Sequence, residues 1–330
     1  MPGLLVATGV MLVVALAAGR YQIGLDELAA LLWRGLTAPH SLPHTADATV
    51  LFRVRLPRVC AALMVGTALS ASGACYQATF RNPMVDPSLL GVSAGAALGA
   101  AAGILLSLGV VGIQLLAFGA GLAAVLVTIL LSSLVSKQGE GTLTLVLCGI
   151  VTGTLCTALL SLLKYVADPY SKLPAITYWL MGSLASANLL DAGLAALFTV
   201  AGTIPLILLR WRINVLSFGD EEATAMGVNT RAVRAVVIAA STLLTASAVA
   251  ISGMIGWVGL VVPHLARMLV GPSFAVLLPT SLLLGALFLL TVDTVSRVVF
   301  AVEIPLGILT AIIGAPFFIY LLVRGRRGWA

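Results

Sequence analysis

The stretch AVLVTILLSSLV, residues 124–135, contains no charged side chain and is bounded by further apolar residues. With those flanks it is long enough to cross about 30 Å of hydrocarbon as a helix. LLVATGVMLVVALAAG (4–19) and PTSLLLGALFLLTV (279–292) have the same character. The whole chain is 60% hydrophobic and 9% charged, whereas a soluble domain carries roughly 25% charged residues. This composition predicts an all-α, polytopic membrane protein.

Hydropathy along the chain predicts about ten transmembrane spans. They cover residues 3–19, 57–78, 90–108, 111–135, 142–166, 190–210, 231–251, 255–269, 274–297 and 305–323. LPAITYWLMGSL (173–184) is too short to span and predicts an interfacial or re-entrant helix, with Tyr178 and Trp179 at the level of the headgroups. No Lys or Arg precedes the first apolar run, which favours an uncleaved span over a signal peptide. Residues 1–330 are therefore expected to form a single transmembrane domain.

The positive-inside rule orients most of these spans but leaves one exception. Basic residues gather in RGRR (324–327) and at Arg210, Arg212, Arg231 and Arg234. These positions are expected to be cytoplasmic, and an even number of spans then places both termini in the cytoplasm. The same topology puts Arg53, Arg55 and Arg58 on the outer side, against the rule. This basic cluster requires another explanation.

The sequence contains no recognisable energy-coupling device of its own. Its three lysines lie in SKQG, LKYV and SKLP, so the phosphate-binding loop GxxxxGK[ST] is missing. A stand-alone secondary transporter or channel is the alternative class, and an ion-coupled carrier usually places an acid or histidine near mid-membrane. The ionisable residues considered for that role map near span ends: Lys164, Asp191, Asp293, Arg297 and Glu303. A subunit driven by a partner fits this pattern better.

Metal and enzyme chemistry are also poorly supported by the residues present. His40 and His44 have helical spacing but lie in a proline-rich loop, APHSLPHTAD. His264, which follows Pro263, is interpreted as a packing or hydrogen-bonding residue. Cys60, Cys75, Cys148 and Cys156 lie in apolar surroundings without CxxC spacing, so they are expected to be packed as small hydrophobes. No HExxH motif occurs, so we expect neither a metal site nor a membrane-embedded enzyme.

Glycines at a spacing of four recur in the third predicted span, at Gly91, Gly95, Gly99 and Gly103. Small residues on one face let two helix backbones approach closely in lipid. This stripe predicts a helix-packing face.

LSFGDEEATAMGV (216–228) is an acidic segment between two long apolar runs. Ser217 and Asp220 have the spacing of a capping box, with Ser217 as the N-cap. The carboxylates that follow would lie at the positive end of a helix dipole, where each is favoured by about 0.3–1 kcal/mol. Ala223 and Met226 would share one face, and Gly227 would end the helix. The segment therefore predicts a short, self-capped helix within a cytoplasmic loop at about 211–230.

Several longer segments carry a family resemblance. They are RLPRVCAALMVGTALSASGACYQATFRNPMVDPSLLGVSAGAALG (55–99), YWLMGSL (178–184), LSFGDEEATAMGV, GWVGLVVPHLARMLVG (256–271) and EIPLGILTAIIGAPFFIYLL (303–322). In this order they resemble the FecCD family, the permease subunits of ABC importers for iron–siderophore complexes, haem and cobalamin. The resemblance implies a type II ABC importer permease fold in the bacterial inner membrane. It also implies a homodimer, two cytoplasmic ATPase subunits and a substrate-binding protein.

The resemblance also implies roles for particular residues. Arg55, Arg58 and Arg297 would bind glutamates of the binding protein, at positions that we expect to be exposed to solvent. The residues of the coupling helix, which contacts the ATPase, would be Ser217, Phe218, Gly219, Asp220, Glu221, Glu222, Ala223, Met226 and Gly227. Thr142 and Leu143, in EGTLTLVLCGIV (140–151), would form a cytoplasmic gate, although Thr142 is also a plausible N-terminal helix cap.

The resemblance leaves no catalytic role for this chain. The partner ATPase would bind ATP and Mg²⁺, and no cofactor is expected here. Iron chelate or haem ranks first as substrate and cobalamin second, and molybdate permeases share the same scaffold.

Overall fold

The computed structural model describes the chain except residues 20, 39–42, 44, 136–140, 300–301 and 326–330. In chain order the elements are α1 (Pro2–Ala17), α2 (Leu25–Thr37), α3 (Ala46–Thr49), the π-helix η2 (Val50–Arg55), α4 (Leu56–Thr79), the 3-10 helix η3 (Pro87–Leu90), α5 (Val92–Leu105), α6 (Val110–Val135), α7 (Gly141–Val166), α8 (Lys172–Met181), α9 (Leu189–Leu208), α10 (Arg210–Leu216), α11 (Asp220–Ala225), α12 (Thr230–Ser252), α13 (Val258–Val270), α14 (Phe274–Val298) and α15 (Leu306–Gly325). All regular structure in these ranges is helical, which confirms the predicted fold class.

Every predicted span coincides with a helix, but not every helix is long enough to cross the membrane alone. Among the described residues, six helices have the length and apolarity of a span, and four apolar helices are shorter. α5 has 14 residues and α13 has 13, so at 1.5 Å per residue each is only about 20 Å long. The predicted spans 90–108 and 255–269 were therefore too long. The 3-10 helix η3 precedes α5 and irregular backbone precedes α13, and the residues directly before the two helices, Gly91 and Trp257, are left-handed.

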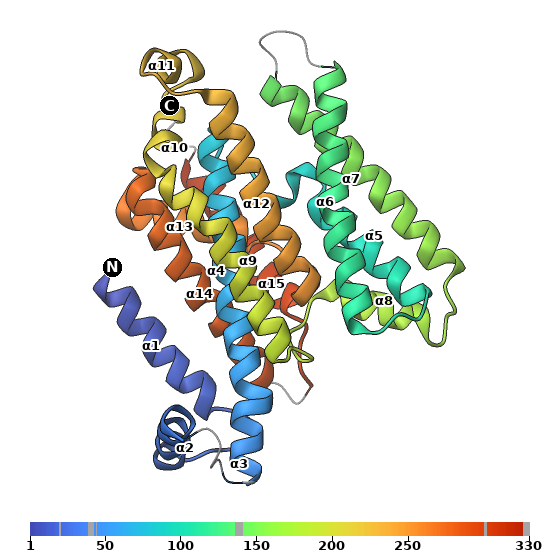
Figure 1. The fold of residues 1–330 in the computed structure, drawn as a ribbon, viewed down its shortest axis with the longest axis vertical. Coiled ribbons are helices and arrows are strands. Elements are labelled where there is room, and N and C mark those ends of the chain that lie inside the picture. The colour runs from blue at the N-terminus through green and yellow to red at the C-terminus, as the bar shows by residue number, and fades with distance from the viewer. Residues whose placement is uncertain (20, 39–42, 44, 136–140, 300–301, 326–330) are drawn as a thin grey trace.

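The core is organised around α4, which contacts α9, α12, α13 and α14 (Figure 1). α4 belongs to a continuous helix, Ala46–Thr79, and 78% of the most apolar 18-residue stretch of this helix is buried within the protein. Glycine makes this burial possible, because a Cβ on Gly73 would overlap the carbonyl oxygen of Gly259 in α13. A Cβ on Gly66 would likewise overlap the carbonyl oxygen of Gly285 in α14. The central helix is thus held by close backbone contacts that larger side chains would prevent.

A second group of helices, α5 to α8, packs beside this core (Figure 1). The predicted glycine face is confirmed, since a Cβ on Gly95 would lie 2.6 Å from the carbonyl oxygen of Ala120 in α6, and one on Gly99 would overlap that of Leu116. The short segment around 173–184 does form a short helix, α8. Its Tyr178 is exposed, whereas Trp179 packs against buried residues of the bundle.

Different short helices lie at the two ends of the bundle (Figure 1). α10, α11 and the described end of α15 lie at one end, and α2 and α3 lie at the other. α1 runs from the amino terminus toward the α2 end, and α15 runs back toward the α11 end. The acidic segment in α11 and the arginines at the η2–α4 junction therefore occupy opposite ends of the molecule.

Candidate functional site

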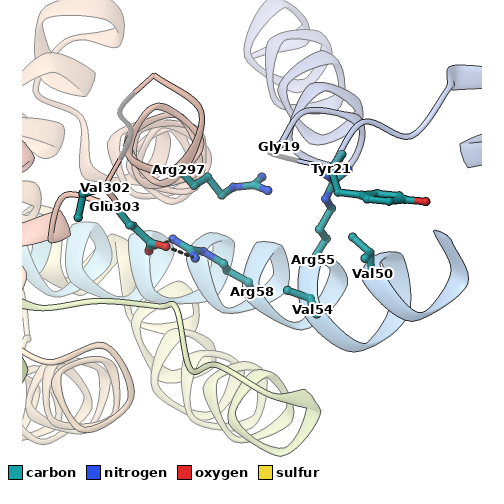
Figure 2. A pocket seen from close by; sticks show the side chains of 9 residues that line it. All are labelled: Gly19, Tyr21, Val50, Val54, Arg55, Arg58, Arg297, Val302 and Glu303. Carbon is teal, nitrogen blue, oxygen red and sulfur yellow. Dashed lines mark hydrogen bonds and ion pairs between the residues drawn. The ribbon is translucent and has the colours of Figure 1, made fainter. Parts of the chain in front are cut away.

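An open pocket of about 500 Å³ lies at the α2–α3 end and is surrounded by arginines (Figure 2). Its lining residues are Gly19, Tyr21, Val50, Val54, Arg55, Arg58, Arg297, Val302 and Glu303. They come from the start of α4 and its preceding π-helix, the end of α14, the segment before α15 and the turn after α1. The structure thus brings together all three arginines that the resemblance singled out.

Arg58 forms the centre of an ion-pair network. Its Nε donates to Asp293 Oδ1 at 2.8 Å, and its two terminal nitrogens donate to Glu303 at 3.1 Å and 2.5 Å. The two carboxylates differ in environment, because the side chain of Asp293 is 0% exposed and that of Glu303 is 27% exposed. The contact with Glu303 is bidentate, the geometry that makes arginine–carboxylate pairs both strong and directional. Arg58 is thereby fixed at the pocket wall.

Arg55 and Arg297 instead bind the carboxyl-terminal end of α1. Arg55 donates to the carbonyl oxygens of Leu16 at 2.6 Å, Ala17 at 2.8 Å and Tyr21. Arg297 donates to the carbonyl oxygens of Ala15 at 2.5 Å and Ala18 at 3.2 Å.

The last carbonyls of a helix have no partner within the helix, and leaving them unpaired in hydrocarbon is costly. Two guanidinium groups meet that need here, and positive charge at this end also suits the helix dipole. Arg55 and Arg297 thus cap α1.

A buried carboxylate, that of Asp293, links the two halves of this cluster. Its Oδ2 forms an ion pair with Nε of Arg297 at 3.4 Å, and neither atom has a hydrogen-bond partner among the described residues. Tyr21 lies at the pocket edge, where a hydrogen bond with Asp47 raises the pKa of its phenol above the ordinary value.

The expected exposure of the arginines was wrong. Arg55 and Arg58 are only 4% and 6% exposed, and the side chain of Arg297 is 11% exposed. A charge near the membrane is stabilised by internal partners, and the chain supplies carboxylates and carbonyls for this purpose. Sequence reasoning placed Asp293 and Glu303 near span ends but did not pair them with Arg58. One signal could have revealed this pairing: the predicted topology places Arg58, Asp293 and Glu303 at span ends on the same side of the membrane, where opposite charges can meet.

The acidic segment at the opposite end forms the short helix α11, as predicted, with Asp220, Glu221 and Glu222 in its first turn. Gly227 follows in the left-handed conformation, at φ 79°. Asp220 forms an ion pair with Arg234 of α12 at 2.9 Å, and Ala223 is fully buried. α11 is therefore tied to the start of a long membrane helix.

The predicted N-cap of α11 was wrong. Ser217 does not cap α11, since its hydroxyl donates to the carbonyl oxygen of Asn214 and it ends the preceding helix, α10. The N-cap position belongs to Gly219, whose φ of 135° suits only glycine. Met226 is the C-cap residue of α11 and is 53% exposed, whereas Ala223 is buried.

Thr142 and Leu143 lie in the first turn of α7 as the structure describes it. Leu143 is 63% exposed. α7 is the least buried of the six long apolar helices, since only 22% of its most apolar 18-residue stretch lies inside the protein. Its outer face carries large apolar residues together with Thr154, Thr157 and Ser161, whose hydroxyls donate to carbonyls one turn earlier. A helix of this kind needs lipid or another protein surface around it.

The candidate metal ligands do not converge in the described part of the chain, where no group of three His, Cys, Asp or Glu side chains could hold an ion. His40 and His44 lie outside the described residues. His264 is partly buried in α13, and the four cysteines are free thiols.

The helical fold, with an arginine pocket at one end and the acidic helix α11 at the other, defines a class: a polytopic helical membrane protein with ionic groups at both ends of its bundle. The family model described as the FecCD transport family matches residues 6–324. The molybdate import system permease protein MolB of Haemophilus influenzae is 41% identical over 99% of this chain and 96% of its own length. A probable iron chelatin transport system permease protein of Helicobacter pylori is 42% identical over 84% of this chain and 83% of its own.

The structural comparison agrees with the sequence comparisons. A solved structure described as an inward-facing conformation of a metal-chelate type ABC transporter has a TM-score of 0.86 and 38% sequence identity, with 98% of each chain covered. The chain belongs to the FecCD transport family of membrane permeases.

Proposed function

We propose that this chain is the membrane-spanning subunit of a binding-protein-dependent ABC importer and works as a homodimer. The observation that carries the proposal is the family membership over residues 6–324, joined to a structure with a protruding acidic helix at one end and an arginine pocket at the other. In this proposal the α11 end faces the cytoplasm, so both termini are cytoplasmic. The arginine pocket then faces the periplasm or cell exterior.

α11 is proposed as the contact with two cytoplasmic ATPase subunits, one for each copy of this chain. Its exposed surface combines Phe218 and Met226, which are 64% and 53% exposed, with the carboxylates of Glu221 and Glu222. Such a surface suits a partner groove with an apolar floor and a basic rim. Because Asp220 is paired with Arg234 in α12, displacement of α11 would be passed to a helix that packs on α4. A short rigid helix transmits displacement that a flexible connection would absorb.

The arginine pocket is proposed as the docking site for a substrate-binding protein that presents carboxylates. Arg58 can form bidentate pairs, which give orientation as well as affinity. Arg55 and Arg297 add positive charge at the same wall, although both are held by α1. Because the pocket is open, the attraction to a carboxylate-bearing surface extends to solvent and steers association.

α7 is proposed to line the substrate path, with Thr142 and Leu143 at its cytoplasmic gate. Its exposed face is too long and apolar to be left in water, and a second copy of the chain would cover part of it. α15 carries a similar exposed face, with Ile312 64% and Ile319 61% exposed. We propose a metal chelate as the substrate, with an iron chelate or haem ranked first and cobalamin second. Molybdate is kept as a further candidate substrate because one relative is named for molybdate import.

Reconstitution tests this proposal. The purified chain alone in liposomes should show neither ATP hydrolysis nor concentrative uptake, and adding the ATPase and the loaded binding protein should produce both. Replacing residues 219–227 by a Gly/Ser linker should leave membrane insertion and binding-protein docking intact while abolishing uptake. A matched Gly/Ser replacement of exposed residues in α2, at the opposite end, should retain uptake.

Two results would contradict the proposal. Uptake or hydrolysis by the chain alone, with contaminating ATPases removed, would favour a self-sufficient transporter. Normal uptake by the linker variant at normal membrane levels would show that α11 is only a connector. The ligand retained by the binding protein, tested with iron chelates, haem, cobalamin and molybdate, identifies the substrate.

A further inference from the structure

Arg58 is held by two carboxylates that are unequal in their ability to move. Asp293 is completely buried on α14 and also lies beside Arg297. Glu303 is partly exposed, lines the open pocket and belongs to the segment before α15 (Figure 2). Figure 2 shows Glu303 reaching Arg58 from the side opposite Arg55.

We propose that Glu303 is an internal placeholder for the carboxylate of the docking partner. It occupies Arg58 while the pocket is free, and the partner's carboxylate displaces it on docking. This inference rests on the proposed docking function and adds a built-in competitor to it.

The geometry selects the Glu303 contact as the one that exchanges at lowest cost. Glu303 binds both terminal nitrogens of Arg58, the same bidentate arrangement that an incoming carboxylate would use. The exchange replaces one carboxylate by another, so Arg58 never becomes an unpaired charge in a buried site. Glu303 is released toward the open pocket and can be hydrated there, whereas Asp293 has no access to solvent.

The other two arginines are less suited to exchange. Their nitrogens donate to the carbonyls that end α1. Taking them away would leave those carbonyls without partners, a cost that no incoming carboxylate can offset because a carboxylate carries no donor. Arg55 and Arg297 therefore contribute charge to docking, and Arg58 contributes the exchangeable contact.

The backbone around Glu303 is anchored, so the exchange needs only a side-chain rotation. The carbonyl oxygen of Ile304 accepts from the Ser296 hydroxyl at 2.9 Å. The amide of Leu306 donates to the carbonyl oxygen of Gly182 at 2.9 Å. With the main chain tied to α14 on one side and to the end of α8 on the other, the Glu303 side chain can leave Arg58 while the α15 entry stays in place.

The test measures the affinity of the permease for its purified cognate substrate-binding protein, at low and high salt. Glu303→Gln keeps the shape of the side chain and removes its charge, so binding should tighten about five- to tenfold, the size expected when a charged hydrogen-bonding competitor is weakened. Glu27→Gln, an exposed carboxylate on α2 at the same end, is the control for a general change in charge and should shift affinity less than twofold. Glu303→Asp, whose reach is shorter, should tighten binding to a smaller extent and serves if the Gln variant is poorly folded.

A double-mutant cycle assigns the effect to Arg58. In an Arg58→Gln background, Glu303→Gln should leave affinity unchanged, because no guanidinium is freed. Unchanged or weaker binding by both Glu303 variants, or tightening that persists without Arg58, would overturn the placeholder. Failure of the proposed docking function looks different, since the wild-type chain would then bind no partner, or Arg58→Gln would bind it as well as wild type does.

Discussion

Replacing Asp293 by Asn tests whether the buried carboxylate organises the arginine pocket. The substitution keeps the shape of the side chain and removes a negative charge 2.8 Å from Arg58 and 3.4 Å from Arg297. Both guanidinium groups are almost buried, with side-chain exposures of 8% and 11%. Arg58 would still be paired with Glu303, whereas Arg297 would keep only neutral carbonyl partners.

The size of the effect follows from this burial. Removing one partner of a buried ion pair costs about 3–5 kcal/mol. Because Asn still accepts a hydrogen bond and Glu303 still pairs with Arg58, we expect the lower end, about 3 kcal/mol. Glu303→Gln breaks a partly exposed pair and should cost about 1 kcal/mol or less. The ranking is a sharper prediction than either value: Asp293→Asn should destabilise the protein more than Glu303→Gln does.

Thermal unfolding of the purified protein in detergent measures this difference. A dye that becomes fluorescent on reaction with thiols reports unfolding directly, since the four cysteines are free and Cys75 is buried. Asp293→Asn should lower the midpoint by on the order of 5 °C, and Glu303→Gln by about 1–2 °C. Adding Arg297→Gln to Asp293→Asn should cost less stability than Arg297→Gln does in the wild-type background, because Arg297 has already lost its neighbouring carboxylate and keeps only the carbonyls of Ala15 and Ala18.

The reasoning would be refuted if Asp293→Asn lowered the midpoint no more than Glu303→Gln did. It would also fail if Arg297→Gln made the Asp293 variant still less stable by its full single-variant effect. Either result would show that solvent or lipid headgroups satisfy Arg297 and that Asp293 does not link the two arginines.

Two further predictions concern the central helix and the proposed path. Gly73→Ala should destabilise the protein by about 1–3 kcal/mol, because its Cβ would overlap the Gly259 carbonyl oxygen; Gly119→Ala, which meets nothing within 4 Å, is the control, and equal midpoints for both would contradict close packing of α4 on α13. Thr142→Cys should crosslink across the proposed homodimer in one nucleotide state and become less reactive in another, as read by mass spectrometry; identical labelling in every nucleotide state, with uptake intact, would remove Thr142 from the gate.

Much of the architecture could be predicted locally, because the properties that define it lie within one segment. Hydropathy identified the six long and four shorter apolar helices of the described chain, and the acidic run before Gly227 identified α11. The spacing-four glycines predicted a packing face that α5 forms with α6. Each of these conclusions depends on residues within a few turns of one another.

The errors have the same origin, since local rules cannot see where a neighbouring element ends. Ser217 has a capping-box spacing with Asp220, but α10 extends to Leu216 and takes Ser217 as its own end. The spans at α5 and α13 were overestimated because hydropathy does not distinguish an apolar helix from the apolar turns that flank it.

The sequence by itself determined the membrane class, the approximate positions of the spans and the RLPR motif that contains Arg55 and Arg58. Tertiary structure alone decided what those arginines bind. Arg58 meets Asp293 and Glu303 across 235 and 245 residues of chain, and Arg55 reaches the end of α1 across 38 or more. Such pairs depend on which helices pack together and in what rotation, and a burial penalty for charge acts only once the helices have assembled around it.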